Sequence, residues 1–145
     1  MSKIVTKKLK MNKEKLREHD IFIKDLSSGR KVIIDVNYPR KNTKKIIRNI
    51  AKKIGDNYKP EKIILFGSYA YGKPKKDSDI DLLIIKKTKA RHIERAIKVR
   101  EIVKEENRFF AIEPLVYTPK EIAKRMEMED DFIKTILDKG VILYG

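Results

Sequence analysis

This chain is organised around the stretch Ile63-Ile64-Leu65-Phe66-Gly67-Ser68, followed after ten residues by Asp79-Ile80-Asp81. The short, continuously apolar run 63–66 predicts a strand that is buried on both faces. Gly67 has no Cβ, so a phosphate can approach its backbone closely. Ser68 is expected to begin a short helix whose free amides face an anion. The stretch therefore predicts a phosphate cradle at the end of a buried strand.

The two aspartates predict a site for a cation beside that cradle. We expect a second strand over residues 79–85, and residues two apart in a strand point to the same face. Asp79 and Asp81 then share one face, while Ile80 and Leu82 enter the core on the other. Two carboxylates that leave room for water and phosphate oxygens suit Mg²⁺ better than an all-protein cage would. The pattern indicates Mg²⁺ acting together with a nucleoside triphosphate.

The segments 66–72 (Phe-Gly-Ser-Tyr-Ala-Tyr-Gly) and 77–82 (Asp-Ser-Asp-Ile-Asp-Leu) resemble the DNA polymerase β-like nucleotidyltransferase superfamily in its minimal form. The resemblance covers roughly residues 43–145. It implies an α/β (α+β) fold in which a small mixed sheet is flanked by helices. It also implies an enzyme that transfers AMP from ATP to a hydroxyl acceptor with Mg²⁺, using two ions.

The resemblance assigns roles to five residues. Gly67 and Ser68 would bind the β and γ phosphates of ATP. The catalytic and metal-binding residues would be Asp79, Asp81 and a third carboxylate on a neighbouring strand, for which Glu113 is the best match. Deprotonation of the acceptor hydroxyl is left open between Glu113 and the acidity that a metal confers.

Glu113 departs from the family pattern, which more often has Asp at this position. Glu is one methylene longer, and the following Pro114 cannot donate a hydrogen bond to a sheet. We therefore expect Glu113 near the start of a strand or on an edge strand. The alternative is that Glu113 is an ordinary surface charge.

Tyr71 is a second departure, because many minimal members have Arg at this position. A guanidinium able to grip phosphate is then missing from the motif. Lys73, Lys75 and Lys76 in the following loop can supply positive charge, although Lys lacks the bidentate fork of Arg. The alternative is that these lysines are simply solvated.

Composition limits the classes of protein to which the chain can belong. Its 145 residues, 41% of them hydrophobic, fit one compact domain with an appendage. The absence of Cys excludes thiol chemistry, disulfides and a Cys-based zinc site, and it makes a reducing cytoplasm the expected location. The first eight residues lack the apolar core of a signal peptide, and no stretch reaches the length of a membrane span. We expect a soluble protein without a membrane partner.

The net charge of +15 is concentrated in the first part of the chain. Residues 1–59 hold 18 Lys and Arg against 6 Asp and Glu, whereas residues 60–145 hold 18 against 15. Such a field favours nucleic acid or an acidic partner. It equally fits the lysine- and glutamate-rich surfaces of heat-adapted proteins.

Apolar periodicity predicts the order of elements in residues 41–145, the expected nucleotidyltransferase domain. One amphipathic helix covers about 43–56, and a second covers 90–106 with Ile93, Ala96, Ile97 and Val103 as its apolar face. A third opens at Thr118-Pro119 with a capping box to Glu121. The remaining expected elements are strands over 62–66, 79–85, 111–117 and 141–144, and a helix over 130–138 that stops at Gly140.

Residues 1–40 form a basic N-terminal extension outside the resemblance. A short helix is expected over residues 13–18, and the apolar runs 21–23 and 32–34 predict a β-hairpin. An isolated hairpin is marginal in water, so it would pack on the core, on a second subunit in a homo-oligomer or on a partner. Partial disorder is the alternative.

A protein acceptor is favoured because a domain this small has no obvious room for the modules with which larger family members grip tRNA, DNA or antibiotics, and the resemblance implies which protein it is. Minimal members of the superfamily act as antitoxins that add AMP to a tyrosine of a cognate helical (HEPN-type) toxin, and we carry this over as the first hypothesis. The second is a catalytically weak binding module that masks a toxin or binds nucleic acid through the basic part of the chain. The third is a nucleotidyltransferase that acts on RNA or on a small molecule.

Overall fold

A computed structural model describes residues 43–75 and 77–145 in full, together with the backbone of residues 4–5, 21–24 and 31–34. The chain divides into two compact units, residues 1–43 and residues 44–145. The helix expected at 13–18 lies outside the described residues, and so does Lys76.

The first unit contains a small three-stranded sheet in the order β1-β3-β2. The strand β2 (Ile21–Lys24) pairs antiparallel with β3 (Lys31–Ile34), with Ile21 opposite Ile34. The strand β1 (Ile4–Val5) pairs parallel with β3 on its other side. The two apolar runs 21–23 and 32–34 therefore lie on neighbouring antiparallel strands.

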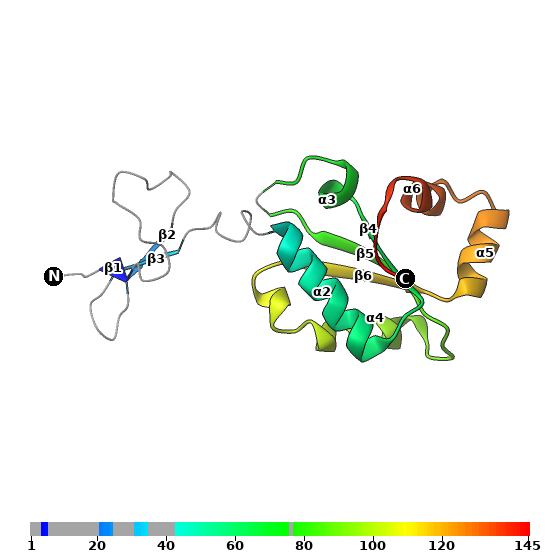
Figure 1. Cartoon of the computed structure of the whole chain (residues 1–145), viewed down its shortest axis with the longest axis horizontal. Helices are drawn as coiled ribbons and strands as arrows, with labels where there is room; N and C mark the ends of the chain where they lie inside the picture. Colours follow the sequence, from blue (N-terminus) through cyan, green and yellow to red (C-terminus); the bar gives the residue numbers. More distant parts are fainter. Residues whose placement is uncertain (1–3, 6–20, 25–30, 35–42, 76) are drawn as a thin grey trace. The chain divides into compact units, whose positions relative to one another are not determined.

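The second unit is built on a four-stranded mixed sheet in the order β6-β5-β4-β7. The strand β4 (Lys62–Phe66) pairs antiparallel with β5 (Ile80–Ile85) and with β7 (Val141–Tyr144). The strand β6 (Ile112–Tyr117) pairs parallel with β5 and forms one edge of the sheet. The predicted small mixed sheet flanked by helices is confirmed (Figure 1).

One face of the sheet is covered by α2 (Thr43–Tyr58) and α4 (His92–Ile102), as Figure 1 shows. The helix α2 buries the predicted stripe, because Ile47, Ile50, Ala51 and Ile54 are at most 4% exposed. These side chains share a core with Leu82 of β5 and with others from all four strands. The 3.6-residue period of α2 therefore predicted its buried face correctly.

The prediction for the apolar face of α4 was wrong at Ile93 and Ile97, whereas Val103, directly after the helix, is fully buried as predicted. Ile93 and Ile97 are 64% and 49% exposed, whereas Arg95 is 8% exposed and Val99 is fully buried. The Arg95 guanidinium is satisfied there, because it donates to the Ala90 carbonyl at 2.8 Å and to Glu121 Oε1 at 2.7 Å. Ion pairing compensates for the burial of this charge, a gain that a hydropathy pattern does not register.

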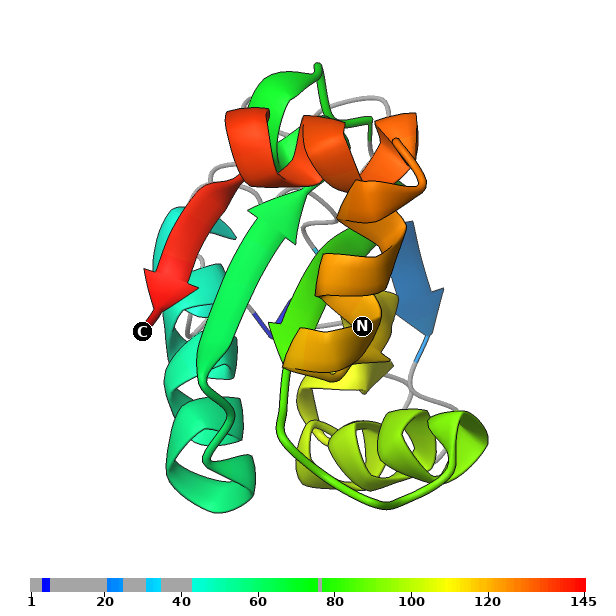
Figure 2. The same cartoon turned by 90° about the vertical axis from the view of Figure 1, so that its right-hand side faces the viewer.

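The opposite face is covered by α5 (Pro119–Glu127) and α6 (Asp131–Lys139), which lie in front of the sheet in Figure 2. Ile133 and Ile136 of α6 pack there against Ile64, Leu83 and Tyr117. The helix α6 is capped by the preceding Asp130, whose carboxylate accepts from the Phe132 and Ile133 amides at 3.0 and 3.2 Å.

Several predicted boundaries shift by a few residues. The helix α4 is shorter than expected and is followed by the 3₁₀ turn η2 (Glu106–Arg108). The capping box at Thr118 is half formed: its hydroxyl accepts from the Glu121 amide at 3.2 Å, but the Glu121 carboxylate pairs with Arg95 and with that hydroxyl. No helix in the described part of the chain is long and apolar enough to cross a membrane.

Candidate functional site

Gly67 lies at the end of β4, where the chain turns into the short helix α3 (Ser68–Tyr71). Its φ of +75° is a conformation that side chains other than glycine rarely adopt. A Cβ built at Gly67 would also overlap the Asp81 carboxylate. The glycine is therefore required for two reasons, and the backbone of the predicted phosphate cradle directly adjoins Asp81.

Ser68 is the first residue of α3, so its amide is among those that a helix leaves without an internal partner. The turn is closed by the amides of Ala70 and Tyr71, which donate to the Gly67 carbonyl at 3.0 and 3.1 Å. Tyr69 and Ala70 pack against the core, whereas Tyr71 is 42% exposed. The helix is thus fixed to the core on one side, while Tyr71 faces solvent.

Asp81 is the second residue of β5 and lies opposite Phe66 of β4. The neighbouring residues Ile80 and Leu82 are fully buried in the core on the α2 side, as the alternation predicted. Asp79 immediately precedes the strand, which begins one residue later than expected. A turn in which the Lys75 amide donates to Ser78 Oγ at 2.7 Å leads the chain into Asp79.

Glu113 lies beside Asp81, because the parallel register of β5 and β6 makes the two residues partners. Neighbouring strands are about 4.8 Å apart, so the two side chains leave the same face of the sheet at adjacent positions. Glu113 is the second residue of an edge strand, as Pro114 led us to expect. Its carboxylate accepts a hydrogen bond from Arg100 Nη2 at 3.2 Å.

The three carboxylates influence one another electrostatically. The pKa of Asp81 is raised above its ordinary value, mainly because the side chain is partly buried and further because Asp79 and Glu113 carry like charges. A group in this position is stabilised by any cation that comes between it and its neighbours. The structure thus brings Gly67, Asp79, Asp81 and Glu113 to one end of the sheet.

The donor set suits Mg²⁺ in part. Carboxylate oxygens are the ligands that Mg²⁺ prefers, and it binds proteins through one or two of them together with phosphate oxygens. Asp81, beside the Gly67 backbone, and Asp79, two residues earlier, provide such a pair. Among the residues that the structure describes, however, no three His, Cys, Asp or Glu side chains are grouped so that they could hold one ion. The predicted set of three carboxylates is therefore not assembled around one point here.

Arg100 is the residue of this site that sequence reasoning missed. It lies on α4, which covers the other face of the sheet, and it reaches Glu113 because β6 is the edge strand. An Arg in a helix rich in charged residues carries no local signal. Only the pairing of β5 with β6 and the packing of α4 bring it to the site.

A separate hollow of about 550 Å³ lies at the other end of the strands. It is lined by Glu61 and Lys62 at the start of β4 and by residues of α5, α6 and β7 that include Ile122, Asp138 and Ile142. Because Gly67 follows the far end of β4, this hollow and the carboxylate cluster are distinct places on the molecule.

Comparison with known proteins gives the family. A model of the nucleotidyltransferase domain matches residues 44–143. Two proteins of Methanocaldococcus jannaschii, each named a putative protein adenylyltransferase, are 46% identical over 41 residues, or 28% of this chain. These matches span 48% and 41% of the two relatives, so the chain covers less than half of their length.

A crystal structure of a putative nucleotidyltransferase from Sulfolobus solfataricus aligns with 74% of this chain. The alignment covers 84% of the Sulfolobus chain, with 21% sequence identity and a TM-score of 0.44. The family assignment depends on the domain model, which covers most of the chain and includes the glycine-serine turn and all three carboxylates. The chain belongs to the nucleotidyltransferase domain family.

Proposed function

We propose that this protein is a Mg²⁺-dependent nucleotidyltransferase that moves AMP from ATP to a hydroxyl group of another protein. The observation that carries the proposal is the meeting of Gly67, Asp81 and Glu113 at the ends of three adjacent strands. The relatives named as putative protein adenylyltransferases support AMP as the group transferred and protein as the acceptor.

Each residue has a defined task in this proposal. The backbone of Gly67 and Ser68 would bind the β and γ phosphates of ATP. Asp79 and Asp81 would hold Mg²⁺, and Glu113 would join them in holding a second ion or would accept the proton of the attacking hydroxyl. Bound Mg²⁺ would neutralise charge on the triphosphate and make the acceptor hydroxyl more acidic. The attacking oxygen forms a bond to the α phosphorus, and pyrophosphate leaves.

The acceptor that we propose is a tyrosine of a cognate helical (HEPN-type) toxin, so that the protein acts as an antitoxin in the cytoplasm. The described unit supports a protein acceptor because it is small and its carboxylates are accessible at the surface. Asp79 and Glu113 are exposed and Asp81 is half-buried at the end of the sheet, and none of the three lines the hollow beside α5 and α6. A side chain presented by a folded partner can reach such a site.

Transfer of radiolabelled adenylate tests this function. The protein is incubated with Mg²⁺ and α-labelled ATP, alone and with the protein encoded beside it, and compared with the Asp79→Asn/Asp81→Asn double variant. Asp138→Asn, which changes a carboxylate in the distant hollow, is the matched control. We expect label on the neighbour protein with the wild type and with Asp138→Asn, and none with the double variant. Label that persists in the double variant would refute the assignment of the metal site.

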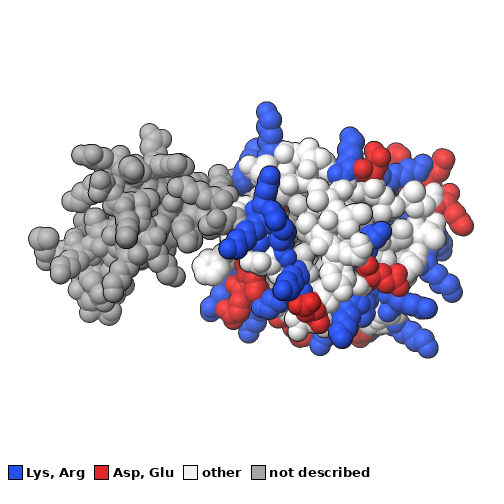
Figure 3. Space-filling view, viewed as in Figure 1, with Lys and Arg blue, Asp and Glu red and all other residues white. Residues whose placement is uncertain are grey.

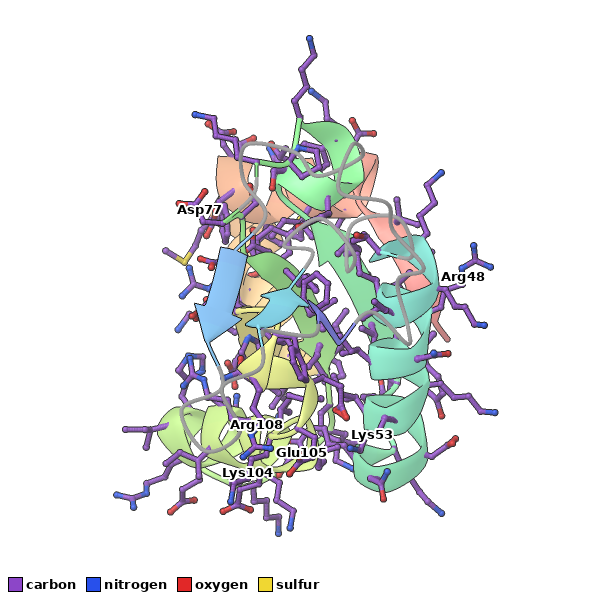
Figure 4. The ribbon with its side chains drawn as sticks, turned by 90° about the vertical axis from the view of Figure 1, so that its left-hand side faces the viewer. Arg48, Lys53, Asp77, Lys104, Glu105 and Arg108 are labelled. Atoms are coloured by element: carbon purple, nitrogen blue, oxygen red, sulfur yellow. The ribbon has the colours of Figure 1, made fainter. Side chains whose placement is uncertain are left out.

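A second candidate is a binding module for nucleic acid, and the charge of α2 favours it. Lys44, Lys45, Arg48 and Lys52 are all exposed on this helix, and Asp56 is its only acidic residue. Figure 3 shows Lys and Arg side chains gathered over the beginning of α2, and Figure 4 shows Arg48 projecting away from the sheet. Such a surface attracts polyanions by counterion release.

The two candidates differ in which substitutions matter. If the protein works by binding, Lys45→Gln/Arg48→Gln should weaken RNA binding and flatten its salt dependence, while Asp79→Asn/Asp81→Asn leaves it intact. Lys120→Gln/Lys124→Gln on α5 controls for loss of two charges elsewhere. Labelled RNA as the product of the transfer assay would instead assign RNA as the acceptor.

A further inference from the structure

Arg100 makes a long-range contact with the predicted third carboxylate. Its Nη2 atom lies 3.2 Å from Glu113 Oε2, and the two side chains are 49% and 53% exposed. The other exposed Arg–Glu pairs among the described residues, Arg91–Glu94 and Arg108–Glu105, join residues three apart on one turn. Arg100–Glu113 is different because it joins a helix to a strand across the sheet edge.

The direction of this contact matters for the site. Asp81 is the partner of Glu113 on the inner side, toward the middle of the sheet. Arg100 belongs to α4 and comes from the outer side, because β6 has no strand beyond it in the described sheet. The guanidinium therefore attracts the Glu113 carboxylate toward the edge and away from Asp81. This agrees with the lack of a three-carboxylate group around one point in the described residues.

We propose that Arg100 is a positioning residue that competes with the metal ion for Glu113 and thereby sets how tightly the site binds Mg²⁺. This inference rests on the proposed function, because it requires an ion at Asp79 and Asp81. Glu113 is held by Arg100 when the ion is absent and turns to the ion when it binds, at the expense of the ion pair. Arg100 acts through Glu113 alone.

The test is a double-mutant cycle read by metal binding rather than by catalysis. Mn²⁺ replaces Mg²⁺, and free Mn²⁺ is measured by electron paramagnetic resonance while the full-length protein is titrated without nucleotide, because a triphosphate would itself bind Mn²⁺. The variants are Arg100→Gln, Glu113→Gln and the double variant. Arg108→Gln is the matched control, since it breaks an exposed Arg–Glu pair of similar length, and Figure 4 shows Arg108 and Glu105 well apart from Asp77, which leads into the site.

We expect Arg100→Gln to lower the dissociation constant for Mn²⁺ by about two- to fivefold, the range that an exposed ion pair can contribute. Glu113→Gln should raise the constant, and Arg100→Gln should have no further effect in the Glu113→Gln background. Arg100→Lys should retain most of the wild-type value, and Arg108→Gln all of it. Urea unfolding should show that Arg100→Gln and Arg108→Gln are equally stable.

Each contrary result has one meaning. If Arg100→Gln changes the dissociation constant for Mn²⁺ equally with and without Glu113, Arg100 acts on the ion directly through its charge. The proposed competition between Arg100 and the ion for Glu113 is then refuted. If Arg100→Gln has the same dissociation constant for Mn²⁺ as Arg108→Gln, while Asp79→Asn/Asp81→Asn abolishes Mn²⁺ binding, the inference about Arg100 fails and the proposed metal site stands. If the aspartate double variant binds Mn²⁺ as the wild type does, the proposed function fails as well.

Discussion

At the scale of single residues, Gly67 combines a positive φ with direct contact between its backbone and Asp81. We expect Gly67→Ala to destabilise the protein by about 1–3 kcal/mol from the backbone alone, because its φ of 75° and ψ of −155° are nearly closed to residues that carry a Cβ. Overlap with the Asp81 carboxylate should add to this cost. Urea unfolding measures the loss, and adenylate transfer should fall with it.

A second substitution separates the two causes. Asp81→Ala removes the overlapping carboxylate and leaves φ unchanged. Gly67→Ala should therefore cost less in the Asp81→Ala background than in the wild type. Equal costs in both backgrounds would show that the carboxylate has no part in the requirement for glycine.

Asp81 should make the stability of the protein depend on pH. The pKa of this carboxyl is raised above 3.8 in the folded protein, first by burial and then by the charges of Asp79 and Glu113. The folded state then binds the proton more tightly than the unfolded state, so stability falls as pH rises from about 3.8 through the folded pKa. We expect Asp81→Asn to be more stable than the wild type at pH 7 and to lose this advantage below about pH 4.

Urea unfolding at a series of pH values checks this expectation, with Asp138→Asn as the control for removing a carboxylate elsewhere. Saturating Mg²⁺ should make the wild type more stable than Asp81→Asn at pH 7, because an ion that binds only the folded wild type stabilises it by mass action. An Asp81→Asn variant that is less stable than the wild type at neutral pH without metal would contradict the electrostatic picture of the site.

At the scale of elements, α4 is attached to the sheet by a buried ion pair as well as by apolar contacts. Arg95 links α4 to the Val116 carbonyl of β6 at 3.4 Å and to Glu121 of α5 at 2.7 Å. We expect Arg95→Ala to lower the free energy of unfolding by about 2 kcal/mol, because it removes charged hydrogen bonds and leaves the Ala90 and Val116 carbonyls without this donor. Ile97→Ala on the exposed side should stay within about 0.5 kcal/mol of the wild type.

Thermal or urea unfolding of both variants decides which face of α4 is packed. A larger loss for Ile97→Ala than for Arg95→Ala would restore the face that hydropathy predicted. It would also remove the basis for placing Arg100 at the sheet edge, because the rotation of α4 about its axis decides the direction of both Arg95 and Arg100.

At the scale of the whole molecule, the second unit contains a complete core. The two clusters of buried side chains draw on residues 47 to 136, and β7 adds the far edge of the sheet. We expect a chain of residues 41–145 to unfold in one cooperative transition, with the free energy of unfolding of this unit unchanged. Urea unfolding followed by circular dichroism measures it.

The same shortened chain tests where polyanions bind. Residues 1–40 hold 11 Lys and Arg against 5 Asp and Glu, so their removal should weaken RNA binding and flatten its dependence on salt. RNA titrations at several salt concentrations give the slope. A slope identical to that of the full-length protein would place binding on the second unit, where α2 carries the exposed cations.

The sequence by itself determined the order and type of the elements in residues 43–145, except for the 3₁₀ turn η2. Apolar periodicity marked the buried face of α2, glycine and proline marked the ends of elements, and Gly67 and Asp81 stood out by their spacing. These signals are local, because each depends on the conformation of a few consecutive residues. The chemical roles of Gly67, Ser68, Asp79, Asp81 and Glu113 stay predictions that the experiments above test.

Only the tertiary structure decided which distant residues meet. Parallel pairing of β5 with β6 placed Glu113 beside Asp81, and the packing of α4 buried Arg95, exposed Ile97 and carried Arg100 to the edge of the site. Strand register and helix rotation depend on contacts between segments that are far apart in the chain. A hydropathy pattern cannot contain that information, because buried charge is compensated by partners that only the fold supplies.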